Sequence, residues 1–319
     1  MIVVTGGEGF IGRAIVQRLT EQGHRVRVVD DLSKGQEESA AGNKEFVRAD
    51  LCDPVAAERA LAGGEVTFHL AAKIGGIGYF HKYPATILND NNLMLANVFG
   101  AAARQGTKVV YVSSSMVYER AERFPTAEEA VASSPPPITH YGFSKLVGEY
   151  YCRAFREEHG VPFVICRPFN AYGPGERAEG EPGIAHVIPD LIEKVMRGDY
   201  PLAIFGSGEQ TRCFTFVEDI AEGVCRAGLD PRGVNEDFNI GVDKPVSIGA
   251  LAEKIWRYCG RTEPFKLEHL PPLTHDIQTR VPDTSKAARL LDWRPRVQLD
   301  EGLQRTIAWI REALAPAKH

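Results

Sequence analysis

TGGEGFIG, at residues 5–12, is the stretch that decides the fold of this chain. Its glycines follow the pattern G-x-x-G-x-x-G, between the apolar run Ile2–Thr5 and the amphipathic segment Phe10–Glu21. In such a loop one glycine permits a tight turn, one lets a pyrophosphate approach the backbone, and one lets helix and strand pack closely. The helix that follows offers free N–H groups to phosphate. A glycine pattern alone is weak evidence, but a strand before it and a helix after it predict a dinucleotide-binding site.

Short apolar runs recur through the first half of the chain and alternate with helical or loop segments. After the first run, they fall at residues 25–30, 45–50, 66–71, 108–113 and 162–167. Short strands separated by helices form right-handed crossover units within a parallel sheet. We therefore predict an α/β fold, a Rossmann-type doubly wound parallel sheet with a smaller C-terminal substrate-binding domain.

The density of glycine and proline rises after about Asn170, first at residues 172–175. We therefore expect a dinucleotide-binding Rossmann domain over residues 1–172 and a substrate-binding domain over residues 173–319. This boundary is soft, because segments within about 214–241 could pack back on the first domain.

The composition argues against several classes of function. The 319 residues carry a net charge of -5, with no basic excess or polybasic tract that would indicate nucleic acid or an anionic membrane. No apolar run approaches the roughly 20 residues of a membrane span, and we expect no secretory leader. The six cysteines are scattered and form no C-x-x-C pair. We expect free thiols, a cytoplasmic location and no metal site.

Acidic residues stand at the end of the second and third predicted strands. A carboxylate of Asp30 or Asp31 can hydrogen-bond a ribose diol, and it would repel a 2′-phosphate. This favours NAD over NADP. Asp50 and Leu51, which close the third strand, could cap the adenine. The alternative interpretation is that Asp30 merely opens a loop.

A tyrosine and a lysine four residues apart open a later amphipathic segment, YGFSK at residues 141–145. Tyr141 and Lys145 would share a helix face, where an ammonium group lowers a phenol pKa. Such a tyrosine can exchange a proton with a carbinol or carbonyl oxygen near neutral pH. Lys145 could also bond the nicotinamide ribose. Upstream, YVSSSMVY at 111–118 ends a strand with three hydroxyls, one of which can bond the same substrate oxygen. This order of motifs is the one that hydride chemistry requires.

Over nearly its whole length the chain resembles the extended short-chain dehydrogenase/reductase family. The shared motifs are TGGEGFIG at 5–12, Asp30, HLAA at 69–72, SSSMVY at 113–118, YGFSK at 141–145, RPFNAYGP at 167–174, FGSGEQTRCFTFVED at 205–219 and VPDTSKAARLLDW at 281–293. The resemblance implies an NAD-dependent enzyme acting on a nucleotide diphosphate sugar, with Ser114, Tyr141 and Lys145 as its catalytic triad. It also implies a homodimer formed by helices near 85–104 and 142–158.

The resemblance and the motifs together specify the remaining site residues. We expect the cofactor to be bound by Gly6, Gly9, Phe10, Ile11, Gly12, Asp30, Asp31, Asp50, Leu51, Leu70, Ala71, Ala72, Asn92, Tyr141, Lys145 and Phe169. We expect the nucleotide sugar to be bound by Ser115, Asn170, His186, Val187, Arg212 and Arg280. Arg212 matches the arginine that holds the diphosphate in the family, although Cys213 stands where an aspartate usually follows it. The alternative for each arginine is a surface ion pair.

The residues after Ser114 restrict the reaction. Family members that are 4,6-dehydratases carry Asp-Glu there, and sugar-acid decarboxylases usually carry a Glu in the same stretch. This chain has Ser115 and Met116. The segment AAKIGGIG at 71–78 resembles GDP-fucose synthase and GDP-mannose 3,5-epimerase, which use a cysteine two residues beyond the catalytic serine. The thioether of Met116 cannot hold or deliver a proton.

One other residue leaves the reaction open. His186 matches a second acid/base position of GDP-fucose synthase, but also a position where UDP-galactose 4-epimerase has a substrate-contacting asparagine. The simplest reaction that survives is epimerisation at C4 through a transient 4-keto sugar, which needs only the triad and NAD. The alternatives are C3 and/or C5 epimerisation using His186, and a nucleotide-sugar 4-ketoreductase. No residue identifies the nucleotide base.

Overall fold

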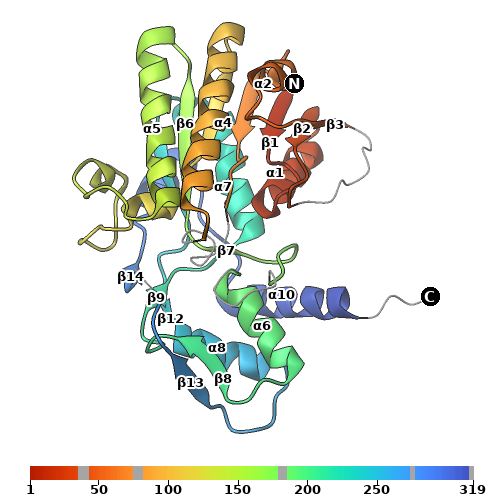
Figure 1. The fold of residues 1–319 in the computed structure, drawn as a ribbon, viewed down its shortest axis with the longest axis vertical. Helices are drawn as coiled ribbons and strands as arrows, with labels where there is room; N and C mark the ends of the chain where they lie inside the picture. Colours follow the sequence, from red (N-terminus) through yellow and green to blue (C-terminus); the bar gives the residue numbers. More distant parts are fainter. Residues whose placement is uncertain (35–42, 75–81, 179–184, 274–276, 316–319) are drawn as a thin grey trace.

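The fold is built on a seven-stranded parallel sheet (Figure 1). The computed structural model describes residues 1–34, 43–74, 82–178, 185–273 and 277–315. The sheet has the order β11-β6-β5-β4-β1-β2-β3. Its strands are β1 (Ile2–Thr5), β2 (Val26–Asp30), β3 (Lys44–Arg48), β4 (Val66–His69), β5 (Lys108–Val112), β6 (Phe163–Pro168) and β11 (Asp237–Ile240). The predicted α/β fold with a doubly wound parallel sheet is therefore confirmed.

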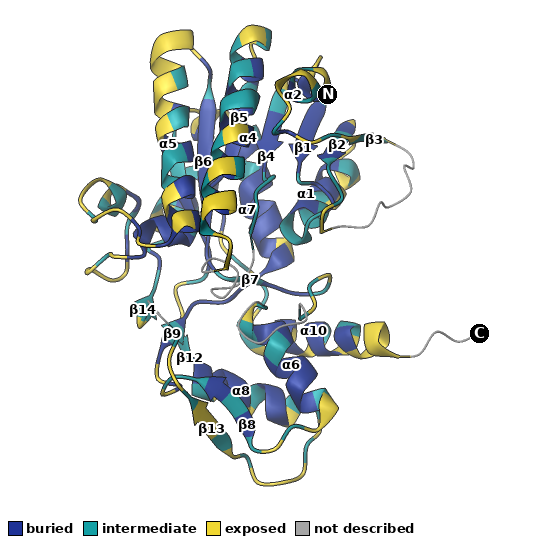
Figure 2. Cartoon of the chain, viewed as in Figure 1, coloured by how far each residue is buried: buried dark blue, intermediate teal, exposed yellow. Residues whose placement is uncertain are grey.

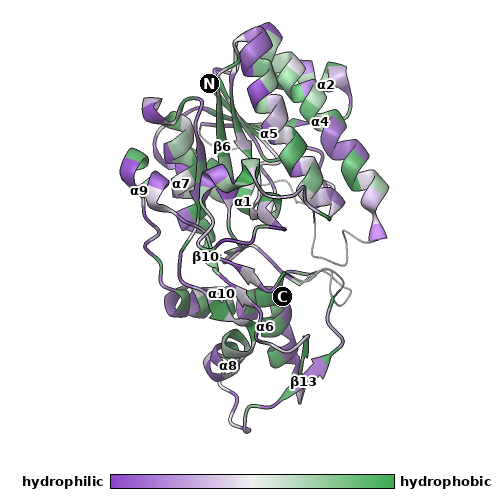
Figure 3. Ribbon diagram, turned by 90° about the vertical axis from the view of Figure 1, so that its left-hand side faces the viewer, coloured by the Kyte–Doolittle hydropathy of each residue, from purple (hydrophilic) through white to green (hydrophobic). Residues whose placement is uncertain are grey.

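Helices cover both faces of this sheet, and Figure 3 shows the two layers on opposite sides of it. One face is covered by α1 (Phe10–Glu21), α7 (Val217–Leu229) and α9 (Ser285–Leu291), and the other by α2 (Pro54–Leu61), α4 (Pro84–Gln105) and α5 (His140–His159). The strands between them are mostly buried, except for the edge strand β3, whose residues are intermediate or exposed (Figure 2). Burial on both faces explains why these strands read as continuous apolar runs rather than alternating ones.

A second hydrophobic core lies below the carboxyl ends of the strands. It is formed by α6 (Val187–Arg197), α8 (Ile248–Tyr258) and α10 (Leu299–Leu314), with Trp256 and Ile307 among its buried residues. The short strands beside it are β8 (Leu202–Phe205) with β13 (Leu267–Leu270), and β12 (Val246–Ser247) with β9 (Thr211–Arg212) and β14 (Thr279–Arg280). Among the described residues, no helix is both long and apolar enough to cross a lipid bilayer.

Late segments of the chain return to the first core. Strand β10 (Thr215–Phe216) pairs with β7 (Ala171–Tyr172), α7 packs against α1, and β11 adds to the sheet beside β6. Helix α9 also packs against α7 and β11, which the sequence did not predict. The short 3-10 helices are η1 (Ser115–Tyr118), η2 (Glu128–Ala132) and η3 (Pro231–Gly233).

Candidate active site

A cavity of about 880 Å³ runs from the carboxyl ends of the sheet strands to the smaller core. It lies at the point where the strand order reverses, between β1 and β4, which is where doubly wound sheets bind nucleotides. The predicted site residues that line it are Gly6, Gly9, Phe10, Ile11, Gly12, Asp30, Asp31, Asp50, Leu51, Leu70, Ala71, Ala72, Ser114, Ser115, Tyr141, Lys145, Asn170, His186, Val187, Arg212 and Arg280.

The glycine loop is built so that only glycine fits. A Cβ added to Gly6, which has φ +68°, would lie 2.7 Å from the backbone nitrogen of Ala71. A Cβ on Gly12 would lie 2.1 Å from the carbonyl oxygen of Gly6. Helix α1, all of whose residues are described, has no side-chain cap and no acid in its first turn. Its N–H groups and positive end therefore suit a pyrophosphate.

Asp30 is oriented by the same loop. Its Oδ2 accepts a hydrogen bond from the backbone N–H of Glu8 at 3.0 Å, and its Oδ1 accepts one from Leu32 at 2.9 Å. Next to it, Asp31 accepts a hydrogen bond from the Lys73 ammonium at 3.1 Å. Burial acts to raise the pKa of Asp31, but hydrogen bonds from Ser33 and Lys73 outweigh it and lower that pKa. The fixed carboxylate of Asp30 suits the ribose of NAD, and the glycine cradle suits its pyrophosphate.

Tyr141 is held by the start of α5. Thr139 caps the helix, because its hydroxyl oxygen accepts the N–H of Gly142 at 3.1 Å. The backbone N–H and hydroxyl of Thr139 in turn donate to Glu119 Oε2, at 2.9 and 3.1 Å. Ser114 caps η1 by accepting the N–H of Met116 at 3.2 Å. Anchored helix starts thus place the phenol and the serine hydroxyl on one cavity wall.

Burial dominates the electrostatics of the triad. Lys145 is 5 % exposed, and burial lowers its pKa to about 7, while its ammonium donates to the carbonyl oxygen of Val112 at 2.8 Å. Burial also raises the pKa of Tyr141, and a hydrogen bond with Ser114 and the charge of Arg280 act in the opposite direction. The sequence predicted that Lys145 would lower the phenol pKa, whereas here Ser114 and Arg280 do so.

The two predicted arginines lie side by side on paired strands, since Arg280 of β14 is in register with Arg212 of β9. The Arg280 guanidinium lies 3.3 Å from Ser115 Oγ and 3.0 Å from Met116 Sδ. Arg212 is 9 % exposed and donates to the Thr211 carbonyl at 2.8 Å. Arg280, predicted only as a contact of the nucleotide sugar, therefore lies beside the two residues that follow Ser114.

His186 faces the cavity from the start of α6, with its Nδ1 hydrogen-bonded to the carboxylate of Glu176. Sequence reasoning missed Glu176, because it lies in the glycine- and proline-rich stretch GPGER and no motif marked it. Asn170 adopts φ +38° and donates to the Cys213 carbonyl at 3.0 Å. This bond joins the segment after β6 to the strand pair that carries Arg212.

Two predicted residues lie off the cavity wall. Phe169 is fully buried and stacks on Tyr118 at 6.1 Å between ring centroids. Asn92 lies on α4, and its neighbour Asn91 is the one that points inward, accepting the N–H of Lys73 at 2.7 Å. Asn91 thereby holds the cavity-lining segment that begins at Ala71. The glycines at 75–78, on which part of the GDP-sugar enzyme resemblance rested, lie outside the described residues.

Comparison with known proteins agrees with this geometry. The NAD dependent epimerase/dehydratase family matches residues 2–241, about three quarters of the chain. The chain belongs to this family. As a member of it, the protein is an enzyme that uses NAD, and the glycine cradle and Asp30 described above fit that cofactor.

Relatives of this epimerase/dehydratase family member act on nucleotide sugars. The chain is 33 % identical to UDP-glucose 4-epimerase from Mycolicibacterium smegmatis, over 97 % of this chain and 98 % of that protein. It is 32 % identical to UDP-glucuronic acid decarboxylase 1 from Xenopus tropicalis, over 98 % of this chain and 72 % of that protein. The crystal structure of UDP-glucose 4-epimerase from Thermotoga maritima with UDP-glucose superposes with a TM-score of 0.89, at 32 % identity over 98 % of this chain and 99 % of that chain. The relatives therefore include two reaction types.

Proposed function

We propose that the protein epimerises a nucleotide diphosphate sugar at C4 through a transient 4-keto sugar. The observation that carries this proposal is the pair Ser115 and Met116 directly after Ser114. The thioether of Met116 cannot deliver a proton, and the hydroxyl of Ser115 is a far weaker acid than the carboxylic acid or thiol that these reactions use. Dehydration, decarboxylation and carbon-acid epimerisation through these positions are therefore disfavoured, and reversible oxidation of one hydroxyl remains.

The residues of the triad have separate tasks in this reaction. Tyr141, as phenolate, removes the proton of the 4-hydroxyl, while Ser114 holds the same oxygen. Lys145 orients the cofactor ribose, and the hydrogen bond with Ser114 and the charge of Arg280 favour the phenolate. When bound, NAD supplies the hydride acceptor and returns the hydride. After the keto sugar has turned in the cavity, Tyr141 gives the proton back to the oxygen of the inverted carbon.

The rest of the cavity suits the nucleotide diphosphate. Arg212 offers a planar guanidinium, which matches phosphate oxygens in bidentate geometry. Asn170 and Val187 lie on the same cavity wall, and Val187 opens α6. We assign these three residues to the nucleotide diphosphate and leave the sugar ring between Arg280 and His186.

One observation favours a second candidate function, epimerisation at C3 or C5. The contact between His186 Nδ1 and the Glu176 carboxylate directs the Nε2 of the imidazole away from that carboxylate. The Nε2 is then the ring atom that faces the substrate and can take a proton from a sugar carbon next to a keto group. This reaction would also need a second acid/base group.

We further propose that the protein is a cytoplasmic homodimer. The helices α4 and α5 pack against each other and expose apolar side chains at Leu93, Phe143 and Tyr150. A second copy of this helix pair would cover them. The free thiols of all six cysteines suit a reducing compartment.

The proposal is tested by incubating the enzyme and NAD with UDP-, GDP-, CDP-, ADP- and dTDP-sugars and following products by NMR. We expect one substrate to convert to its C4 epimer with unchanged mass. A product lighter by water or carbon dioxide, or inversion only at C3 or C5, would contradict the proposal.

A further inference from the structure

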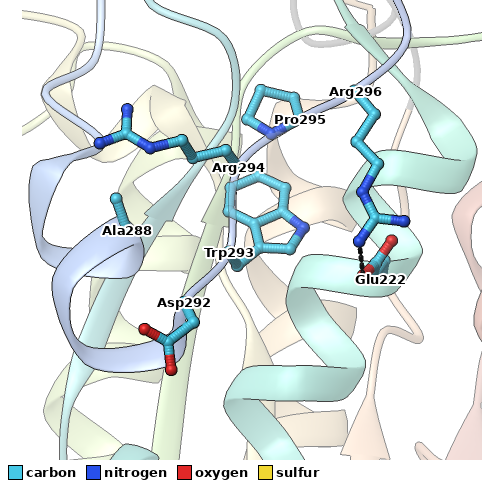
Figure 4. A pocket seen from close by; sticks show the side chains of 7 residues that line it. All are labelled: Glu222, Ala288, Asp292, Trp293, Arg294, Pro295 and Arg296. Carbon is cyan, nitrogen blue, oxygen red and sulfur yellow. Dashed lines mark hydrogen bonds and ion pairs between the residues drawn. The ribbon is translucent and has the colours of Figure 1, made fainter.

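A second cavity, of about 380 Å³, lies on the side of the sheet that α7 and α9 cover. Its described lining residues differ from those of the active-site cavity. They are Glu222, Ala288, Asp292, Trp293, Arg294, Pro295 and Arg296, and Figure 4 shows them around the indole of Trp293. None of the motifs that indicate nucleotide-sugar chemistry includes Arg294 or Arg296, so those motifs do not explain this cavity.

Three guanidinium groups converge on one carboxylate oxygen at this cavity. Glu222 Oε1 lies 3.3 Å from Arg296, 3.4 Å from Arg226 and 3.7 Å from Arg18. Each guanidinium carries five N–H donors in a planar fork, more than one oxygen can accept. Arg226 also donates to the carbonyl oxygens of Leu291 and Asp292 at 3.1 Å, so the excess lies mainly with Arg296 and Arg18. The Nε of Arg18 is buried and has no hydrogen-bond partner among the described residues. Donors are therefore in excess around Glu222.

Trp293 adds a further donor without an acceptor. Its side chain is 2 % exposed, and its indole N–H has no hydrogen-bond partner in the described part of the chain. Figure 4 shows the nitrogen on the edge of the indole that faces Glu222 and Arg296. The ring is held there because it packs on the backbone of α7, where a Cβ on Gly223 would lie 2.8 Å from it. A buried donor left unpaired costs free energy, which an acceptor in the cavity would recover.

The local charge also favours an anion. Arg294 and Arg296 line the cavity, and Arg18 and Arg226 contact its Glu222, whereas the carboxylates are Glu222 and Asp292. Four cations against two anions leave a local excess of two positive charges in a chain whose net charge is -5. Phosphate matches this set, because it brings two negative charges and several acceptor oxygens for guanidinium forks and an N–H group.

We propose that this cavity binds a phosphate group, either inorganic phosphate or the phosphate of a nucleotide. Arg296 and the indole N–H of Trp293 contact the phosphate oxygens. Arg226 stays bound to Glu222 and to the carbonyl oxygens of Leu291 and Asp292, and Arg18 adds positive charge beside the ligand. The site stands apart from the active site and does not depend on which sugar carbon the enzyme inverts.

The indole N–H groups of the three tryptophans provide the test. NAD-saturated protein labelled with ¹⁵N-tryptophan is titrated with inorganic phosphate, with UDP, and with NaCl at matched ionic strength. Trp293→Phe assigns the Trp293 signal, and Trp309, which lines the active-site cavity, reports binding there separately. The variant Arg296→Gln removes a proposed ligand contact. Its matched control is Arg289→Gln, which removes the same charge from an exposed position of α9.

We expect phosphate or UDP to shift the Trp293 signal saturably, beyond the effect of NaCl. Arg296→Gln should weaken this binding about tenfold, the loss of one charge-assisted hydrogen bond, while Arg289→Gln leaves it nearly unchanged. Tighter saturation by UDP identifies a nucleotide phosphate, and tighter saturation by phosphate identifies the free ion. A Trp293 signal that follows only ionic strength, or equal effects of the two variants, would overturn the proposal.

Discussion

At the scale of single residues, the proposed chemistry requires a phenol that is buried yet able to release its proton. Tyr141 is 4 % exposed, and this burial raises its pKa. The hydrogen bond with Ser114 and the charge of Arg280 reduce that cost. The same burial lowers the pKa of Lys145 to about 7, so its charge changes near neutral pH. Burial therefore shifts the pKa values of both Tyr141 and Lys145.

The first residue-scale prediction concerns Tyr141→Phe. Removing the hydroxyl removes the group that takes and returns the substrate proton, so turnover should fall by about 10²–10⁴-fold. NAD affinity should stay within about threefold, because the ring remains to line the cavity. Activity assays and NAD titration measure both quantities. The control is Tyr150→Phe, on the same helix but 65 % exposed, which should keep full activity. An active Tyr141→Phe enzyme would remove the phenol from the mechanism.

The second residue-scale prediction concerns the contribution of Lys145 to the pH dependence of stability. Its pKa is about 7 in the folded protein, below the ordinary lysine value of 10.5, because burial penalises the charged form. Above pH 7 the folded protein therefore binds fewer protons than the unfolded chain, and stability rises with pH. The free energy of unfolding relative to Lys145→Met should increase by up to about 1.4 kcal/mol per pH unit from pH 7 to 10, and level off below pH 7.

Thermal and urea unfolding of the two proteins without added NAD, at several pH values, measure this difference. A difference that stays constant or decreases over the range would mean that Lys145 keeps its charge when buried.

The sequence could predict those site residues that lie close to one another along the chain. Tyr141 and Lys145 are four residues apart on one helix, and the glycines of the loop are three apart, so spacing alone places them. The position of Arg280 beside Ser115 could not be predicted this way, because 165 residues separate them and the β9–β14 pairing brings them together. The contact between Glu176 and His186 likewise depends on the path of a loop that has no sequence signature.

At the scale of elements, the junction between β1 and α1 leaves little room for substitution of its glycines. The close approach of Gly12 to the Gly6 carbonyl allows the helix to start directly above the strand. Asp30 at the end of β2 is fixed by the Glu8 N–H of the same junction. One loop therefore shapes the pyrophosphate site and also orients the ribose carboxylate. The sequence could predict this junction because the glycine pattern, the strand and the helix are contiguous.

The element-scale prediction is that Gly12→Ala prevents NAD binding. The added Cβ would lie 2.1 Å from the Gly6 carbonyl oxygen and 2.8 Å from the Gly7 Cα, and these backbone atoms cannot move aside as a flexible side chain could. NAD titration and thermal unfolding measure the effect. The matched control is Gly100→Ala within α4, where the nearest atom is a guanidinium nitrogen of Arg104 at 3.4 Å. That change should leave NAD affinity unaltered and stabilise the protein by about 0.5–1 kcal/mol. Wild-type NAD affinity in Gly12→Ala would show that the loop does not cradle the cofactor.

At the scale of the whole molecule, a buried polar network joins the sheet to its helices. Arg167 of β6 is fully buried and donates to both Glu149 oxygens at 2.7 Å, and to Asp237 of β11 at 2.8 Å. Glu149 also accepts the hydroxyl hydrogen bond of Ser113 at 2.7 Å, one residue before Ser114. The network thus connects the late strand β11 and helix α5 to the strand end that carries Ser114.

This network gives the whole-molecule stability prediction. Arg167→Met should destabilise the protein by about 3–5 kcal/mol, because it leaves the Glu149 carboxylate buried without its partner. The matched control is Arg153→Met. Arg153 contacts the same carboxylate at 3.9 Å but is 46 % exposed, so its loss should cost less than about 1 kcal/mol. Urea unfolding measures both. Equal costs for the two variants would show that the buried pair does not hold the layers together.

The wider architecture was predictable only in part. The alternation of short apolar runs and helices indicated the parallel sheet, but β11 and α9 come from beyond residue 230 and pack beside early elements. Their placement depends on long-range partners such as Arg167 for Asp237. No local pattern in the sequence reports such partners.

The central claim is that the enzyme inverts C4 by removing and returning one hydride, without exchanging carbon-bound hydrogen with water. The most direct measurement is conversion of the identified nucleotide sugar by the enzyme and NAD in heavy water, with product analysis by NMR and mass. We predict a C4 epimer that contains no carbon-bound deuterium. Deuterium at C3 or C5 of the product would contradict the claim, and would make His186 a carbon acid/base instead of a substrate contact.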